Sequence, residues 1–243
     1  MQRRPRRIIG FSTGAIAKGD FRSALHTLRA HAVEAVELSA LRAEELEPLI
    51  QALPTLDLTG FAFISIHAPS RFTAEEEAHV IEQLLSPAAS GFPIVVHPDV
   101  IYRPDLWQPF ENRLLIENMD KRKPVGRTVT ELAPFFYKLP KARFCFDIGH
   151  ARQVDPTMTE AALLLNAFAD RLAEVHMSEV NTASRHDPIS NNAVDAFTQV
   201  AVLIPDYVPI ILEPLIDRGQ SDVETEIHRA HHIFAAAMEV LAP

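Results

Sequence analysis

Six apolar segments of this chain each end in a histidine or an acidic residue, and these residue types suit catalysis or metal binding. The clearest case is Phe144-Cys145-Phe146, which is followed by Asp147 and, three residues later, by His150. Such residues follow one another at intervals close to the length of one strand and one helix. They are His67, His97, Glu117, Asp147 with His150, His176 and Glu213.

Carboxylates and imidazoles that meet at one place would form a site for a divalent cation. Acidic side chains repel one another, and their burial without a counter-charge is costly. A divalent cation removes both problems, and these side chains are ordinary ligands of Mn²⁺ and Zn²⁺. We therefore expect one Mn or Zn ion, and the number of histidines allows a second. Each residue alone also has a simpler explanation as a hydrogen-bonded loop residue, an ion-pair partner or a helix cap.

The segment 184–189 offers a second group of polar side chains. Arg185 can clamp a phosphate or a carboxylate, and His186 can reach the same site. An ordinary polar loop explains this segment equally well. The remaining histidines fall within expected helices, where surface or packing roles are simpler: His26, His31, His79, His228, His231 and His232.

Apolar segments alternate with amphipathic segments along the whole chain. A strand covered on both faces is apolar throughout, as in a parallel sheet surrounded by helices. The alternation predicts one domain over 1–243, an α/β fold of the (β/α)8 TIM-barrel type, with a fourth helix shortened to a turn or two around 104–110. A doubly wound sheet is the alternative, but segment 10–14 is a poor match for its glycine-rich phosphate turn. The expected strands are 8–12, 35–39, 61–67, 92–97, 114–117, 143–148, 172–176 and 208–213.

In such a barrel, the C-terminal ends of the strands meet at one mouth, where catalytic groups lie. The candidate residues are therefore expected to converge there. Helix starts are predicted from capping residues, whose side chains accept the first free backbone N–H groups. These are Asp20, and the pairs Thr73 with Glu76, Thr157 with Glu160, and Ser221 with Glu224.

Composition and charge limit the function further. The chain contains no run of about 18 or more apolar residues, so no membrane-spanning helix is predicted. The net charge of −9 argues against electrostatic binding to nucleic acid. The single cysteine, Cys145, excludes an intramolecular disulfide and fits a reducing cytoplasm. Residues 1–7 are predicted to be a flexible basic arm rather than a signal sequence.

With these residues in view, the chain resembles the xylose isomerase-like TIM-barrel superfamily, which contains sugar phosphate isomerases and epimerases and endonuclease IV. The resemblance covers nearly the whole chain and depends on short motifs in order on the strands: IGFS at 9–12, VELS at 36–39 and ILEP at 211–214. It implies that one divalent metal is held by side chains from strands five to eight. The matching residues are Glu117, Asp147, His176 and Glu213.

The resemblance to endonuclease IV implies further zinc ligands. Ser184 stands where that enzyme has the aspartate of an Asp-x-His motif, and segment 68–71 departs from its DNA-probing loop. Together with the acidic net charge, these departures argue against a nuclease. The residues that match its additional ligands are His67, His97, His150 and His186.

The resemblance implies an isomerase or epimerase that acts on a sugar or a sugar-derived hydroxy-carbonyl compound through an enediolate. Glu117 and Glu213 would exchange the proton on the carbon next to the carbonyl. His67, His150 and Arg185 would orient hydroxyl or anionic groups of this small-molecule substrate. The alternatives are an endonuclease IV-like metal-dependent phosphodiesterase and a metabolite-binding barrel without catalysis. The number of subunits, including a homo-oligomer, is left open.

Overall fold

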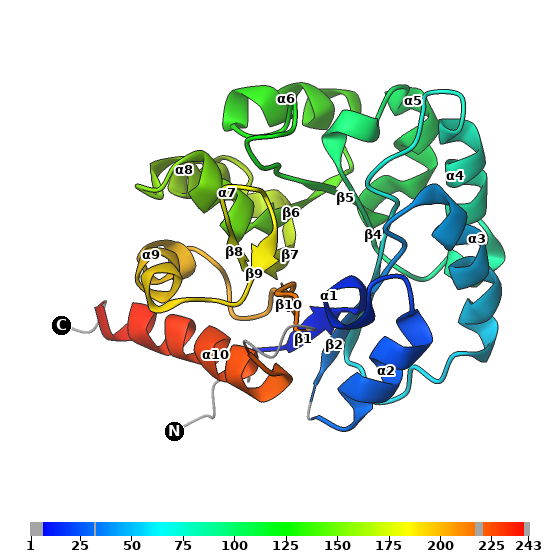
Figure 1. Ribbon diagram of the computed structural model, residues 1–243. Coiled ribbons are helices and arrows are strands. Elements are labelled where there is room, and N and C mark those ends of the chain that lie inside the picture. Colours follow the sequence, from blue (N-terminus) through cyan, green and yellow to red (C-terminus); the bar gives the residue numbers. More distant parts are fainter. Residues whose placement is uncertain (1–6, 32, 217–220, 241–243) are drawn as a thin grey trace.

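Eight parallel strands close into a barrel in the computed structural model, which describes residues 7–31, 33–216 and 221–240 (Figure 1). Around the barrel the strands follow the order β1-β10-β7-β6-β5-β4-β3-β2, and every neighbouring pair is parallel. The predicted (β/α)8 barrel is confirmed. Its strands are β1 (Ile9–Ser12), β2 (Ala35–Ser39), β3 (Phe63–His67), β4 (Ile94–Val96), β5 (Leu114–Glu117), β6 (Arg143–Asp147), β7 (Leu172–Met177) and β10 (Ile210–Leu212).

Helices surround the barrel and alternate with its strands (Figure 1). The fourth connection carries the four-residue helix α5 (Pro104–Trp107), so the predicted shortening of the fourth helix is confirmed. Two short helices, α1 (Thr13–Ala17) and α7 (Ile148–Val154), start directly after β1 and β6. The other α-helices are α2 (Phe21–Arg29), α3 (Ala43–Ala52), α4 (Glu77–Leu84), α6 (Val129–Lys138), α8 (Thr159–Ala167), α9 (Asn191–Ala201) and α10 (Val223–Val240).

Shorter elements connect these helices and strands. After β7 the chain forms an antiparallel ribbon of β8 (Glu179–Val180) and β9 (His186–Asp187), which contains the polar segment noted in the sequence. The 3-10 turns are Leu53–Thr55, Pro87–Ala89, Pro98–Val100, Gln108–Arg113 and Ala169–Arg171. No helix in the described part of the chain is both long and apolar enough to span a membrane.

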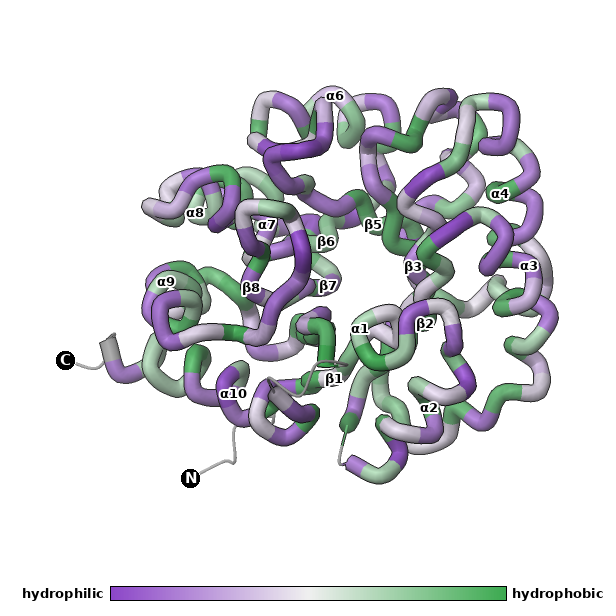
Figure 2. The backbone as a smooth tube through the Cα atoms, viewed as in Figure 1, coloured by the Kyte–Doolittle hydropathy of each residue, from purple (hydrophilic) through white to green (hydrophobic). Residues whose placement is uncertain are grey.

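The apolar core has two parts. The larger cluster includes Leu28, Leu46 and Phe144 and fills the space between strands and helices. Figure 2 shows the corresponding hydrophobic colouring of the barrel wall. The smaller cluster contains Cys145 with Val95 and lies on the opposite face of the strands, inside the barrel. Cys145 is fully buried, as a small packed side chain should be.

Several predicted boundaries and caps differ from the structure. Asp20 caps α2 as expected, because its carboxylate accepts from the Ser23 N–H. The predicted cap of Thr157 with Glu160 is wrong: Asp155 accepts from the backbone of Thr157 and of Glu160 instead. A carboxylate has two oxygens that can accept several N–H groups, so it displaces a threonine from this role.

Two further caps and the N-terminus complete this comparison. At the pair Ser221 and Glu224, the predicted cap is also wrong, because Asp222 accepts from the Thr225 N–H. At Thr73, half of the predicted box is present, since Glu76 accepts from the Thr73 N–H. Residues 1–6 of the predicted basic arm lie outside the described residues. Arg7 is buried and donates to the backbone of Ile204 and Pro205 and to Asp206.

Gly10 allows β1 and β2 to approach closely, and this gives a first prediction. A Cβ at Gly10 would lie 1.7 Å from the backbone oxygen of Ala35, so Gly10→Ala must push the two strands apart. We expect the free energy of unfolding, measured by urea denaturation, to fall by about 1–3 kcal/mol. Gly91→Ala is the matched control, because its Cβ would meet open space. Equal stability of the two variants would contradict this account.

Candidate metal centre

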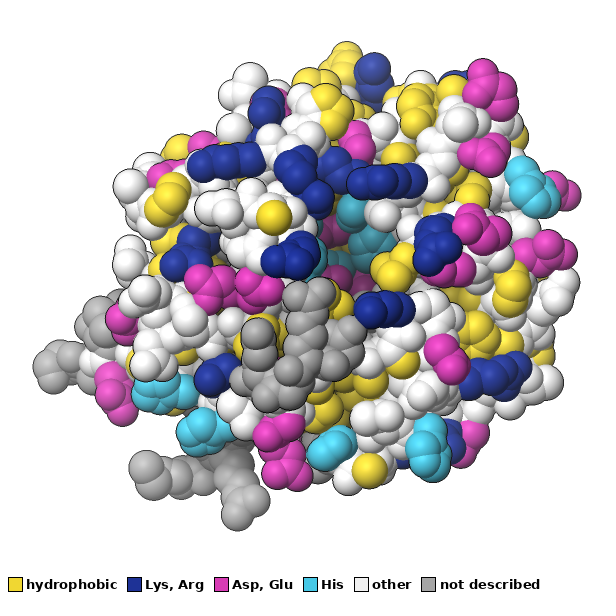
Figure 3. Space-filling view, in the orientation of Figure 1, with side chains coloured by type: hydrophobic (Ala, Val, Ile, Leu, Met, Phe, Trp, Pro, Cys, Tyr) yellow, Lys and Arg dark blue, Asp and Glu magenta, His cyan; other side chains and the backbone are white. Residues whose placement is uncertain are grey.

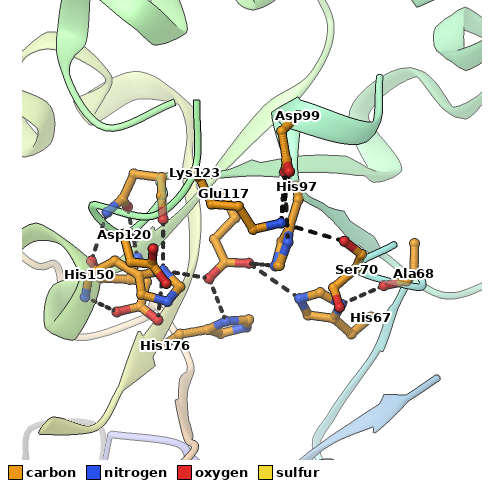
Figure 4. Close-up of polar contacts among 12 residues, drawn as sticks. His67, Ala68, Ser70, His97, Asp99, Glu117, Asp120, Lys123, His150 and His176 are labelled. Carbon is orange, nitrogen blue, oxygen red and sulfur yellow. Dashed lines mark hydrogen bonds and ion pairs between the residues drawn. The ribbon is translucent and has the colours of Figure 1, made fainter. Parts of the chain in front are cut away.

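Glu117 lies at the centre of the barrel mouth, at the C-terminal end of β5 (Figure 4). One carboxylate oxygen, Oε2, lies 3.2 Å from His67 Nε2 and 3.2 Å from His97 Nε2. The other, Oε1, lies 3.3 Å from His150 Nδ1 and 3.4 Å from His176 Nδ1. Four imidazoles from four parts of the chain therefore surround one buried carboxylate.

The predicted ligand set converges at this mouth. Glu117, Asp147, His176 and Glu213 each offer one ligand atom, and these atoms all lie within 4.8 Å of one another. Asp147 Oδ2 and His176 Nδ1 are buried and form no hydrogen bond with any described residue. Glu213 Oε2 lies 3.5 Å from His176 Nδ1. Buried carboxylate and imidazole atoms that converge on one point in this way fit a divalent cation.

Local structure after β6 aims Asp147 into the site. Asp147 Oδ1 accepts from the His150 N–H at 2.7 Å and so caps α7, which leaves Oδ2 for the mouth. The Asn118 side chain bonds both the N–H and the C=O of Asp147 at 2.8 Å. Gly149 is required in the first turn of helix α7, because a Cβ there would lie 2.3 Å from the Ser178 backbone oxygen. The carboxylate is thus fixed by backbone contacts on either side.

A second group of potential ligands consists of His67, His97 and Glu117. His67 Nδ1 lies 2.7 Å from the Ala68 carbonyl and donates to it, so in neutral His67 the Nε2 lone pair faces Glu117. Either a proton or a cation must separate the two atoms. Without a metal the proton takes this place: burial lowers the pKa of His67, but the negative charges of Glu37 and Glu117 outweigh burial and raise it to about 9.

The remaining predicted residues take different positions around the mouth. His150 Nδ1 lies 3.0 Å from the Asn118 carbonyl and 3.2 Å from Asp147 Oδ2. His186 Nδ1 lies 2.8 Å from Ser178 Oγ and 3.5 Å from Glu213 Oε2. Arg185 lies on the exposed side of the ribbon and lines the mouth of the cavity. The mouth therefore brings together all nine predicted site residues, with Arg185 at its rim.

Burial and neighbouring charges shift the pKa values of the carboxylates in different directions. Burial raises the pKa of Glu213 to about 8, and the charges of neighbouring carboxylates add to this effect. Burial also raises the pKa of Asp147 to about 6, although His150 opposes it. Glu117 differs, because the surrounding imidazoles outweigh its burial and hold its pKa well below the usual range. Without a cation, protons on Glu213 and on the three histidines whose pKa is raised, His67, His150 and His176, balance the buried charge.

Two buried acids of the site were missed in the sequence analysis. Glu37 on β2 and Glu174 on β7 are fully buried, and Glu37 forms a third group of possible ligands with His67 and His176. Their only signal is a charged residue within an otherwise apolar strand. The predicted segments 35–39 and 172–176 both contain that signal, which marks an inward-facing polar position.

Basic side chains surround the mouth, in contrast to the acidic net charge of the protein. Figure 3 shows lysine and arginine around a hollow with histidine and acidic side chains at its base. The cavity has a volume of about 420 Å³, a size suited to a small molecule. Asp120 and Asp99 pair with two of these cations, Arg122 and Lys123. The basic residues that line the cavity are Lys18, Arg71, Arg122, Lys123 and Arg185.

Solved structures with the same fold include several different enzymes. Endonuclease IV from Thermus thermophilus superposes with a TM-score of 0.59 at 20% identity, over 97% of this chain and 100% of that one. A putative sugar phosphate isomerase/epimerase from Anabaena variabilis gives 0.55 at 13%, over 97% and 99%. Dihydropteroate synthase from Yersinia pestis gives 0.54 at 13%, over 98% and 94%.

These similarities confirm the predicted TIM-barrel fold. Barrels with different activities superpose on this chain with similar TM-scores, so fold similarity does not identify the reaction. No protein-family model and no curated protein matches the sequence. The function has to be argued from the site.

Metal binding at this site should depend on pH, which is the second prediction. A cation must displace the proton on Glu213, whose pKa is raised to about 8, and the proton on Asp147, whose pKa is raised to about 6. We therefore expect the apparent Mn²⁺ affinity to rise by about 10-fold or more between about pH 6 and pH 8. Competition with a chelator of known pH dependence measures this change. A flat or falling affinity would contradict the assignment of Glu213 as a ligand.

Proposed function

We propose that the protein is a divalent-metal-dependent isomerase or epimerase that acts on a small hydroxy-carbonyl compound, a sugar or sugar-derived acid. The observation that carries this proposal is the geometry of two carboxylates. Glu117 Oε1 and Glu213 Oε2 lie 3.4 Å and 3.5 Å from His176 Nδ1, yet they come from β5 and from the residue after β10. Two strands, β6 and β7, separate them in the barrel.

This arrangement suits proton transfer at a carbon next to a carbonyl. One carboxylate can remove the proton from a substrate in the mouth, and the other can return a proton from another direction. Residues His67 and His150 can donate to the substrate oxygens. When bound, a divalent cation acts as a Lewis acid and neutralises the negative charge that develops on the enediolate. Glu117 and Asp147 are buried, which strengthens these electrostatic effects.

The basic rim supports a substrate that carries a carboxylate or a phosphate. Arg122 is paired with Asp120, and Lys123 with Asp99. Arg71 and Arg185 form no side-chain hydrogen bond or ion pair with any residue that the structure describes. Planar guanidinium groups bind carboxylates and phosphates through two parallel hydrogen bonds. These two arginines would hold the anionic end of the substrate while its hydroxy-carbonyl end enters the mouth.

A metal-dependent phosphodiesterase remains the second candidate. The specific observation in its favour is the group His67, His97 and Glu117, whose ligand atoms also lie within 4.8 Å of one another. With Glu117 shared by both groups, two cations would lie side by side, as suits attack on a phosphodiester. The paired acids at the rim and the small cavity favour a small substrate over duplex DNA.

The third prediction tests the proposed function through metal content and proton exchange. Elemental analysis of protein purified without chelator should find about one Mn or Zn per chain, and Glu117→Ala should lose it, because this variant removes a charged ligand. Two or more zinc ions with cleavage of abasic-site DNA would support the phosphodiesterase instead. No bound metal would leave the metabolite-binding barrel as the remaining candidate.

Glu213→Gln should then abolish isotope exchange without unfolding the protein. Proton NMR in D₂O, with a panel of ketoses and sugar acids, follows exchange at the carbon next to the carbonyl. We expect the rate to fall by at least about 100-fold, the usual contribution of a positioned acid–base group. Glu82→Gln on the exposed surface of α4 serves as the control. An active Glu213→Gln variant would contradict the role given to this residue.

The fourth prediction concerns the anionic end of the substrate. The metal-loaded protein should bind glycerol 3-phosphate or D-glycerate more tightly than glycerol, as measured by calorimetry. The double variant Arg71→Gln with Arg185→Gln should weaken anion binding by about 10-fold or more, since charge-assisted hydrogen bonds are lost. Arg103→Gln, on an exposed arginine outside the cavity, should change nothing. Equal binding of all three compounds would contradict an anionic substrate.

A further inference from the structure

The two nitrogens of His176 face two different acidic groups. Nδ1 faces the proposed metal ligands Glu117 and Glu213. Nε2 points the other way, into the barrel, where it lies 3.2 Å from Glu37 Oε2 and 3.4 Å from Glu174 Oε1. His176, Glu37 and Glu174 are all fully buried. The imidazole therefore connects the mouth with a pair of carboxylates inside the barrel.

These two carboxylates are poorly satisfied for buried groups. Ser65 Oγ donates to Glu174 Oε1 at 2.9 Å, and Ser39 Oγ lies 3.4 Å from Glu37 Oε1. Glu174 Oε2 forms no hydrogen bond with any described residue, and Glu37 Oε2 depends on a proton on His176 Nε2, which lies 3.2 Å away. Incomplete hydrogen bonding of a buried charge costs stability.

Apolar side chains in place of Glu37 and Glu174 would stabilise the barrel more than these poorly satisfied carboxylates do. The interior residues Val95, Leu115 and Cys145 form a buried apolar cluster of this kind. Stability therefore does not explain why acids occupy β2 and β7 at this point. Their shared contact, His176 Nε2, indicates what they do instead.

We propose that Glu37, together with Glu174, is a positioning residue that accepts the Nε2 proton of His176 and thereby turns the Nδ1 lone pair toward the metal. This inference rests on the proposed metal site. An imidazole carries one proton when neutral, and a carboxylate beside one nitrogen keeps the proton there. The other nitrogen is then free to bind a cation, and the carboxylate also increases its basicity. Glu37 touches neither substrate nor metal in this role.

The chain contains a matched control. Glu77 on α4 is also fully buried, but its Oε1 accepts from Trp107 Nε1 at 2.9 Å, from the Tyr102 N–H at 2.9 Å and from the Arg103 N–H at 3.1 Å. These bonds hold α4 to the segment that leads into α5. Glu77 therefore has a structural role, and none of its hydrogen bonds goes to a residue of the metal site.

The fifth prediction compares Glu37→Gln with Glu77→Gln. For Glu37→Gln, we expect the Co²⁺ affinity to fall by about 10- to 100-fold, as for other carboxylates behind metal-binding histidines. The thermal midpoint of its metal-free form should equal or exceed that of the wild type, because a poorly satisfied charge is removed. Glu77→Gln should show the reverse: a lower midpoint and an unchanged affinity. Titration with Co²⁺ against a chelator, with visible absorption of the bound ion, gives the affinity.

Several outcomes would overturn the proposal. An unchanged Co²⁺ affinity in Glu37→Gln contradicts it, while the proposed function survives if the wild type binds one ion. A wild type that binds no Co²⁺ contradicts both. If Glu37→Gln does not fold, ¹⁵N NMR of the zinc-loaded wild type decides. A proton on His176 Nε2 supports the proposal, and a proton on Nδ1 contradicts it.

Discussion

Concentrated negative charge at the mouth of the barrel is the constraint on which the other features of this protein depend. Glu117, Asp147 and Glu213 approach one another, and the first two are almost completely buried. Carboxylates are stable there only with a proton, an imidazolium or a metal ion beside them. The structure provides for each of these: a proton on Glu213, whose pKa is raised, imidazolium groups at His67, His150 and His176, and buried acceptor atoms that form no hydrogen bond with any described residue.

Hydrogen bonds and close backbone contacts, rather than the apolar core, hold the acidic side chains of the mouth in position. Asn118 bonds the backbone of Asp147 on both sides, and Gly149 lets α7 start within contact of Ser178. Inside the barrel, polar residues take positions that apolar ones would fill more stably. A site of this kind is held in place at some cost to folding stability, as is common where ligands must be pre-organised.

Specificity depends on the loops that follow the strands. The barrel is shared with an endonuclease, an isomerase-like protein and a synthase at 13–20% identity. The rim of the cavity is basic although the net charge of the protein is negative, because Arg71 and Arg185 approach the cavity from separate loops. A negatively charged protein with a positive entrance attracts small anions and repels other acidic molecules.

The alternation of strands and helices, the shortened fourth helix and the residues that end each strand could all be predicted from the sequence. Those features are local, since apolar runs and the polar residue after each run can be read along the chain. The tertiary structure was needed to show which nitrogen of His176 faces Glu117 and Glu213, and that Glu37 and Glu174 both approach its other nitrogen. It also decided that Asp155 and Asp222, rather than Thr157 and Ser221, cap their helices. These outcomes depend on distances between atoms from separate strands and on competition among nearby acceptors, and the order of residues does not contain either.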